Sequence, residues 1–125
     1  MEWKLEVVVV PVTDVDRAKD FYVNKLGFHL DADTRPTPVL RVVHMTPPGS
    51  ACSVVVGPVQ VPAGTDLSSV GSYQLVVSDI EAAHAELLQR GVEVGDVQDF
   101  PWGRFVFFSD PDGNSWAVQQ VPPRP

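Results

Sequence analysis

The sequence repeats one pattern twice, and this repetition constrains the fold more than any other feature. Asp14-Val15-Asp16 in the first half corresponds to Asp79-Ile80-Glu81 in the second half, at an offset of 65 residues (79 − 14). In each half an acidic residue suited to cap a helix precedes an apolar stripe at helical spacing, and a glycine, Gly27 or Gly91, follows it. Because the capping residue, the apolar helical positions and the terminating glycine agree between the halves, the sequence indicates an internal duplication.

Hydrophobic periodicity predicts the same order of elements in both halves: one strand, one helix and three strands. In the first half the pattern predicts a helix capped by Asp14 and strands over residues 5–10, 28–31, 39–45 and 52–56, with a turn over residues 34–38. In the second half it predicts a helix capped by Asp79 and strands over residues 74–77, 92–94, 105–109 and 115–121. The sequence therefore predicts an α+β fold made of two βαβββ modules.

A segment rich in proline and glycine connects the two halves. We expect module 1 over about residues 1–57, a linker over about residues 58–71 and module 2 over about residues 72–125. A chain of 125 residues is the size of a single domain, so we interpret the modules as two parts of one domain. Neither module buries both faces of its sheet alone, and two curved sheets side by side would form a concave surface.

Charge and composition exclude several functions. A net charge of −7 with no compensating basic stripe disfavours nucleic acid as a partner. No apolar run reaches the roughly 18 residues of a membrane span, and the start of the chain does not resemble a signal peptide, so we expect a cytoplasmic protein without membrane contact. Cys52 is the only cysteine, which excludes an intrachain disulfide.

Three segments resemble the vicinal oxygen chelate superfamily, which includes glyoxalase I, extradiol dioxygenases and bleomycin-resistance proteins. They are Val12-Thr-Asp-Val-Asp-Arg-Ala-Lys-Asp-Phe-Tyr22, Leu26-Gly-Phe28 and Phe108-Ser-Asp-Pro-Asp-Gly-Asn-Ser-Trp116. The resemblance covers nearly the whole chain. It implies two βαβββ modules that form a curved mixed-sheet cleft, and a homodimer.

The resemblance also implies where metal-using members hold their metal, at four strand positions usually occupied by His or Glu. In this sequence they map onto Val7, Ser72, Ala117 and, within one residue, Val54. None of these side chains is a good ligand for a divalent cation, which needs imidazole, carboxylate or thiolate. We therefore predict no metal and no other cofactor, and a divalent metal only at a displaced site.

Several side chains are candidates for binding a ligand in the cleft. Gln74 and Gln119 each lie two residues beyond a lost metal position, so strand alternation turns them toward the same side. An amide both donates and accepts hydrogen bonds, although a wet sheet edge explains these residues equally well. Trp102, in a loop, is a candidate for stacking on a flat ligand.

Phe105, Arg41 and His44 complete the candidate ligand-binding set. Phe105 shares a strand face with Phe107 near the expected pocket, and packing under the second helix is the alternative for both. Arg41 is a candidate anchor for an anionic group. His44 is the histidine placed to face the cleft, and a partly buried structural role is its alternative.

These inferences favour a metal-independent protein that binds a small organic molecule. The alternative is a lyase, isomerase or dioxygenase of the superfamily that uses a displaced metal site with His44 or acid–base chemistry without metal. A second alternative is a non-catalytic interaction module. The sequence leaves open the identity of the ligand, the catalytic residues, the arrangement of the dimer, and a role in resistance, metabolism or regulation.

Overall fold

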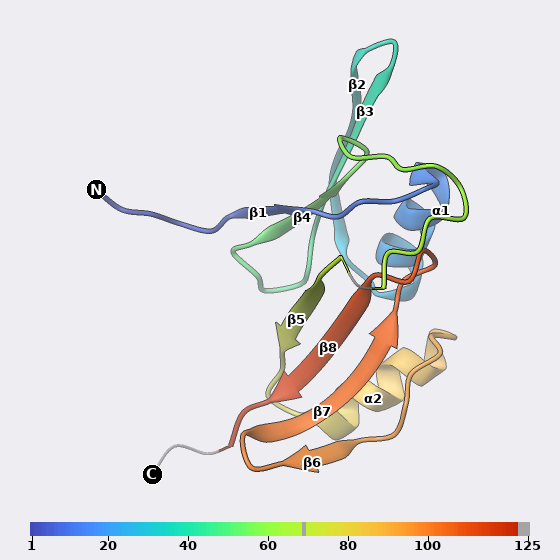
Figure 1. Ribbon diagram of the computed structural model, residues 1–125. Helices are drawn as coiled ribbons and strands as arrows, with labels where there is room; N and C mark the ends of the chain where they lie inside the picture. Colours follow the sequence, from blue (N-terminus) through green and yellow to red (C-terminus); the bar gives the residue numbers. More distant parts are fainter. Residues whose placement is uncertain (69, 123–125) are drawn as a thin grey trace. The chain divides into compact units, whose positions relative to one another are not determined.

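The computed structural model describes residues 1–68 and 70–122, and the chain divides into two compact units between Thr65 and Asp66. Each unit contains a four-stranded mixed sheet with a helix (Figure 1). The boundary lies inside the predicted linker over residues 58–71. Residue 69 of that linker and residues 123–125 of the predicted second module lie outside the described residues.

The first unit follows the predicted order of one strand, one helix and three strands. Its elements are β1 (Val7–Val9), α1 (Val15–Asp20), a short π-helical continuation η1 (Phe21–Lys25), β2 (His29–Thr37), β3 (Leu40–Thr46) and β4 (Ser53–Val56). The second unit repeats this order with β5 (Ser72–Val76), α2 (Ile80–Gln89), β6 (Gln98–Phe100), β7 (Gly103–Ser109) and β8 (Ser115–Gln120). None of the helices within these described ranges has the length and hydrophobicity to span a membrane.

The two sheets have the same topology. Their strand orders are β1-β4-β3-β2 and β5-β8-β7-β6, with the first strand of each unit parallel to the last and the other pairs antiparallel. The shared topology agrees with the internal duplication, and the α+β class predicted from the sequence is confirmed.

Both helices begin with the predicted aspartate cap. The side chains of Asp14 and Asp79 each accept a hydrogen bond of 3.1 Å from the backbone N–H three residues later, that of Arg17 or Ala82. The two caps have nearly identical backbone angles, φ −140° and ψ 110° at Asp14 against φ −143° and ψ 102° at Asp79. Each cap satisfies a donor that the first helical turn leaves without an intrahelical acceptor.

Two predicted elements were wrong in position. The strand expected at residues 92–94 is absent from this described region, where Val94 makes only an isolated bridge to Phe108, and the strand instead lies at β6. Val92 is buried directly after α2, and this burial explains the apolar residue that led to the strand prediction. The turn expected at residues 34–38 is shorter, because β2 continues through Pro36. β2 is an edge strand, where proline removes no essential hydrogen bond.

In the second unit, one face of the sheet packs on α2 and the other face is open. Val106 pairs with Val118 and Phe108 pairs with Trp116, and these four buried side chains share the face of Ile80 from α2. The opposite face, called here the open face, carries the alternate residues of the same strands: Ser72, Gln74, Phe105, Phe107, Ala117 and Gln119. The core therefore lies on one side of the sheet and leaves the other side for a site.

Candidate functional site

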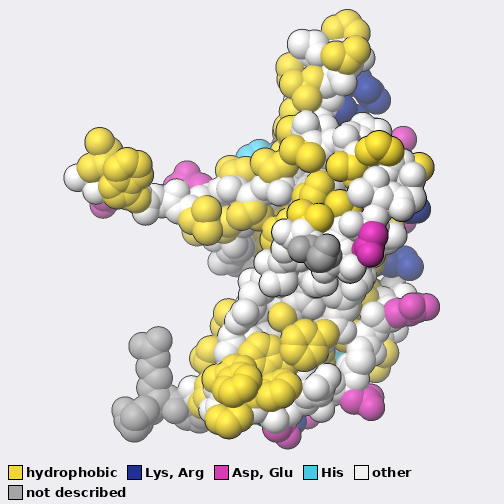
Figure 2. All heavy atoms as spheres, viewed as in Figure 1, with side chains coloured by type: hydrophobic (Ala, Val, Ile, Leu, Met, Phe, Trp, Pro, Cys, Tyr) yellow, Lys and Arg dark blue, Asp and Glu magenta, His cyan; other side chains and the backbone are white. Residues whose placement is uncertain are grey.

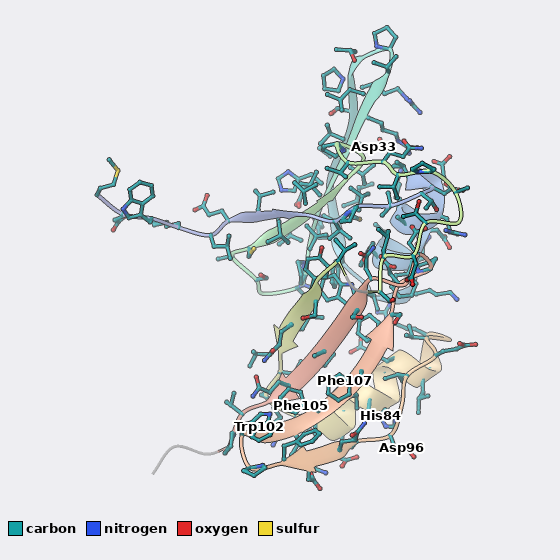
Figure 3. The ribbon with its side chains drawn as sticks, viewed as in Figure 1. Asp33, His84, Asp96, Trp102, Phe105 and Phe107 are labelled. Carbon is teal, nitrogen blue, oxygen red and sulfur yellow. The ribbon has the colours of Figure 1, made fainter. Side chains whose placement is uncertain are left out.

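The open face of the second unit contains a hollow of about 390 Å³. The mapped metal positions Ser72 and Ala117 line it, together with the predicted ligand-binding residues Gln74, Gln119, Trp102 and Phe105. Phe100 and Phe107 complete its aromatic side. Figure 3 shows Trp102, Phe105 and Phe107 gathered at one end of the second unit, whereas His84 lies on α2.

The aromatic side of the hollow is a stacked group of four rings, called here the aromatic wall: Phe100, Trp102, Phe105 and Phe107. Phe105 stacks on Phe107 with ring centroids 5.6 Å apart, and Phe100 stacks on Trp102 at 5.2 Å. An edge-to-face contact of 5.6 Å between Phe100 and Phe105 joins the two pairs. These spacings are those of favourable aromatic pairs, so the wall is internally ordered.

The aromatic wall is only partly covered by the chain. Phe105 is 6% exposed, but Phe107 is 42% and Trp102 is 60% exposed. The space-filling view shows a hydrophobic patch on this part of the second unit (Figure 2). Large aromatic surface left in water at a hollow is typical of a binding site.

Two glutamines form a hydrogen-bonded chain along the hollow. Gln119 Nε2 donates to the backbone carbonyl of Trp102 at 2.9 Å, and Gln74 Nε2 donates to Gln119 Oε1. This chain fixes the orientation of both amides, because each nitrogen donates and each oxygen must then accept. Gln74 Oε1 has no donor within the described part of the chain and is left as an acceptor.

Gly103 allows the turn that carries Trp102 to approach β8. A Cβ atom at Gly103 would lie 2.7 Å from the carbonyl oxygen of Gln120 and 3.1 Å from Gln119 Nε2. Its φ of +147° is also rarely adopted by residues with a side chain. Glycine at this position therefore brings the Trp102 carbonyl within reach of the Gln119 amide.

The structure places three of the four mapped metal positions on open sheet faces. Ser72 and Ala117 line the hollow, and Val7 pairs with Ser53 on the exposed side of β1. Val54 is buried and pairs with Val8 and Met45 on the opposite face of that sheet. Strand alternation therefore puts Val55, one residue along, on the same face as Val7.

The donor set at these positions does not fit a divalent metal. Valine, serine and alanine side chains supply neither imidazole nor carboxylate. Across residues 1–68 and 70–122, no group of three or more His, Cys, Asp or Glu side chains is arranged to hold a metal ion.

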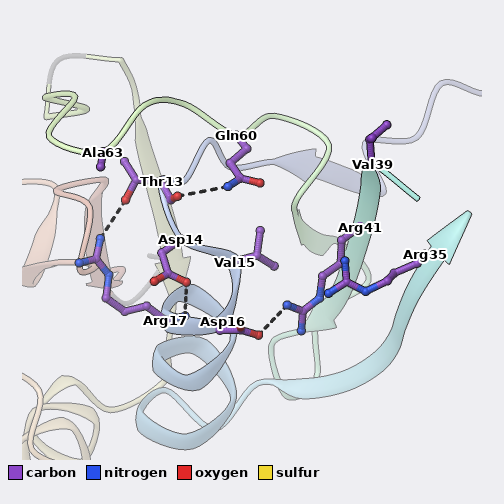
Figure 4. Close-up of a pocket in the computed structure, with 10 residues that line it drawn as sticks. All are labelled: Thr13, Asp14, Val15, Asp16, Arg17, Arg35, Val39, Arg41, Gln60 and Ala63. Carbon is purple, nitrogen blue, oxygen red and sulfur yellow. Dashed lines mark hydrogen bonds and ion pairs between the residues drawn. The ribbon is translucent and has the colours of Figure 1, made fainter. Parts of the chain in front are cut away.

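Arg41 lies in the first unit, beside a separate hollow of about 520 Å³ (Figure 4). Its guanidinium is 2.6 Å from Asp16 and 2.8 Å from Asp33, and Lys19 also contacts Asp33 at 2.9 Å. These hydrogen bonds hold the pKa of the Asp33 carboxyl well below its usual range and raise the pKa of Arg41. The charge of Arg41 is thus largely balanced by its own neighbours.

His44 is half-buried on β3, where it pairs with Val55 of β4. Arg41 and His44 both belong to the first unit, whereas the other four predicted ligand-binding residues line the hollow of the second unit. A ligand-binding role for Arg41 and His44 stays a prediction.

Sequence reasoning missed Phe100 and left two interpretations of Phe107 open. Phe100 has no periodic signal, because β6 is only three residues long. The sequence is compatible with a place near the pocket or with packing under the second helix, and in the structure Phe107 lies on the open face with Phe105. The alternation of β7 predicted that these two rings share a face, and did not determine which face.

Comparison with known proteins agrees with this architecture. Residues 4–118 match the family model of the Glyoxalase/Bleomycin resistance protein/Dioxygenase superfamily. The protein YetH of Bacillus subtilis (strain 168) is 29% identical over 118 residues, which cover 94% of this chain and 98% of YetH.

Two solved structures illustrate the range of relatives. TnmS3, an antibiotic binding protein from Streptomyces sp. CB03234, is 35% identical with a TM-score of 0.78, over 97% of this chain and 98% of TnmS3. A superfamily member from Sphaerobacter thermophilus DSM 20745 is 31% identical with a TM-score of 0.77, over 95% of this chain and 98% of that one. This chain therefore belongs to the Glyoxalase/Bleomycin resistance protein/Dioxygenase superfamily.

Proposed function

We propose that this protein binds a small organic molecule with a planar aromatic part, in the hollow of the second unit and without metal. The observation that carries the proposal is the aromatic wall, whose exposed rings stand beside two amides held in one orientation. Such a combination supplies both a flat apolar contact and a directional polar contact.

Trp102 and Phe107 provide the apolar part of the proposed binding energy. Both rings are exposed at the hollow, and the ring stacking beneath them holds them in place before a ligand arrives. A preorganised wall loses little side-chain entropy on binding. A flat ligand that covers these two rings would remove their apolar surface from water.

Gln74 provides the polar part. Its Nε2 is engaged by Gln119, so its Oε1 faces the hollow as an acceptor. Gln74 is exposed, so a ligand N–H or O–H placed at this oxygen would replace a hydrogen bond from water with a directional one from the ligand. We therefore expect the ligand to carry a donor beside its aromatic ring.

Binding without chemistry is the simplest use of such a hollow. The mapped positions Ser72 and Ala117 carry no group that could hold a Lewis-acid metal. TnmS3 is an antibiotic binding protein, which supports sequestration of a small molecule as the proposed role. We also propose a homodimer, as the family resemblance implies, and a cytoplasmic location.

Titration with planar aromatic compounds tests the proposal. A library of aromatic antibiotics and polyketide-like molecules is screened by thermal shift, and the compounds that raise Tm are titrated by calorimetry. Trp102→Ala and Phe107→Ala should each weaken binding by about tenfold to a hundredfold. Leu88→Ala, an equally exposed apolar side chain on α2, is the control and should bind unchanged.

Two results would contradict the proposal. Full affinity in Trp102→Ala and Phe107→Ala would place the ligand elsewhere, and no binding across the library would remove the binding function. Elemental analysis of the purified protein tests the metal-independent part separately. A metal ion retained at one per chain after dialysis against a chelator would exclude that part.

A further inference from the structure

The hollow of the first unit is separate from the proposed ligand site and differs from it in charge. It has a volume of about 520 Å³, a size typical of small-molecule sites, and lies beside the start of α1 and the hairpin of β2 and β3 (Figure 4). Three arginines and two aspartates line it: Arg17, Arg35, Arg41, Asp14 and Asp16. The lining therefore carries one net positive charge, although the whole chain carries −7.

Arg41 is held in a fixed orientation at this hollow. Its guanidinium donates to the two carboxylate oxygens of Asp33 at 3.0 and 2.8 Å, and Lys19 donates to the same carboxylate at 2.9 Å. A two-point contact of this kind fixes the plane of a guanidinium. The remaining Nη1 donates to Asp16 at 2.6 Å, and because Asp16 and Arg41 both line the hollow, this contact lies at its surface.

Asp16 is a replaceable partner of Arg41. The side chain of Asp16 is 82% exposed, whereas that of Asp33 is 23% exposed. An exposed ion pair contributes little to stability, so breaking the contact between Asp16 and Arg41 costs little free energy. The carboxylate of Asp16 thus occupies the position from which an oxyanion of a ligand would contact Arg41.

Arg35 supplies a second cation at the same place. Its side chain is exposed and makes no hydrogen bond or ion pair with any other described residue. In Figure 4 the side chains of Arg35 and Arg41 extend from the hairpin in the direction of Asp16. The hydrogen bond with Arg41 lowers the pKa of Asp16, and the charge of Arg35 lowers it further, so both guanidiniums act on one carboxylate.

We propose that the hollow of the first unit binds a small anionic molecule, whose carboxylate or phosphate displaces Asp16 and lies between Arg35 and Arg41. Guanidinium groups recognise both kinds of oxyanion, because their N–H donors match the spacing of the anion's oxygen atoms. The proposal concerns the first unit alone and does not depend on the ligand site of the second unit.

Titration of the wild-type chain with two probes tests the site: inorganic phosphate and succinate, which has no aromatic ring. Binding is followed by NMR through the backbone amides of residues 13–17 and 39–41, at constant ionic strength because salt screens exposed charges. At least one probe should give saturable shifts that are confined to the first unit. The probe that binds more tightly identifies phosphate or carboxylate as the group recognised.

Charge-removing variants test the displacement of Asp16. Asp16→Asn should bind the tighter probe about fivefold more strongly, because the competing carboxylate is removed. Asp20→Asn is the matched control, since it removes the same charge from α1 at a position that does not line the hollow, and its affinity should change by less than about twofold. Arg35→Gln should weaken binding by about fivefold, and Lys25→Gln, an exposed cation outside the hollow, is its control.

Three results would overturn the proposal. They are the absence of saturable shifts with either probe up to about 50 mM, an affinity of Asp16→Asn equal to that of the wild type, and equal gains in Asp16→Asn and Asp20→Asn. The last result would show a general effect of charge rather than a site. Circular dichroism verifies folding, and the affinity of these variants for planar aromatic compounds should be unchanged, which separates this test from that of the second unit.

Discussion

The side-chain amide of Gln119 donates a 2.9 Å hydrogen bond to the backbone carbonyl of Trp102, which precedes it by 17 residues. This contact joins β8 to the turn between β6 and β7, and so connects the amide side of the hollow to the aromatic wall. Its removal should affect the orientation of Gln74 and the position of Trp102 together.

Gln119→Leu should weaken ligand binding by about tenfold. The variant keeps the size of the side chain but removes the donor to Trp102 and the acceptor for Gln74. The free energy of unfolding should change by less than about 1 kcal/mol, because the side chain is half-buried. Calorimetric titration and urea unfolding measure the two effects, and Gln89→Leu on the surface of α2 is the control. An equal loss of ligand affinity in Gln119→Leu and Gln89→Leu would contradict this role of the Gln119 hydrogen bonds.

Gly103→Ala should destabilise the second unit by about 2 kcal/mol or more. The added Cβ would lie 2.7 Å from a backbone carbonyl oxygen, which cannot move away as a side chain could. Gly95→Ala is the matched control, since a Cβ there has no heavy atom within 4 Å, and its stability should stay within about 0.5 kcal/mol. Urea denaturation measures the stability of both variants. Similar urea midpoints for Gly103→Ala and Gly95→Ala would show that Gly103 does not approach the Gln120 carbonyl closely.

Asp14→Ala and Asp79→Ala should each lower the free energy of unfolding by about 1 kcal/mol. The two caps have the same hydrogen-bond length and nearly the same backbone angles, so their losses should agree. Asp96, an exposed residue of the second unit that caps neither helix, provides the control as Asp96→Ala (Figure 3). Thermal and urea unfolding measure the loss of unfolding free energy in each variant. Markedly unequal losses would mean that the two caps differ in energy despite their shared geometry.

Asp33→Asn should cost about 1–2 kcal/mol at pH 7, because the Asp33 carboxylate accepts hydrogen bonds from Arg41 and Lys19. The lowered pKa of Asp33 means that its contribution is fully present above the unfolded pKa of about 3.9 and is lost as the pH falls toward the folded pKa. The difference in the free energy of unfolding between wild type and Asp33→Asn should therefore become smaller below about pH 4. Urea unfolding at pH 7 and pH 3 measures this, and a difference that grows on acidification would contradict the ion pair.

Local sequence patterns determined most of the fold. The repeated caps Asp14 and Asp79 and the stops Gly27 and Gly91 act within a few residues, so their geometry follows from their immediate neighbours. Strand alternation also predicted that Gln74 and Gln119 share a face, because side chains repeat every two residues. These features need no knowledge of distant contacts.

Other features depended on residues far apart in the chain. Arg41 is predicted from the sequence as a candidate anchor for an anionic group. Only the pairing of β2 with β3 and the position of α1 bring Asp33 and Asp16 to its guanidinium. Val92–Val94 had the composition of a strand, yet the partner of β7 became Gln98–Phe100. Pairing is decided by the whole sheet, since a short segment matches several partners almost equally well.

The sequence by itself determined a duplicated α+β chain whose mapped metal positions carry valine, serine and alanine, because residue identity and periodicity are local properties. Only the tertiary structure decided that Phe100, Trp102, Phe105 and Phe107 form one wall and that Gln119 reaches the Trp102 carbonyl. The physical reason is that these contacts cross three strands and a turn, and their energies depend on how the strands pair rather than on any single segment.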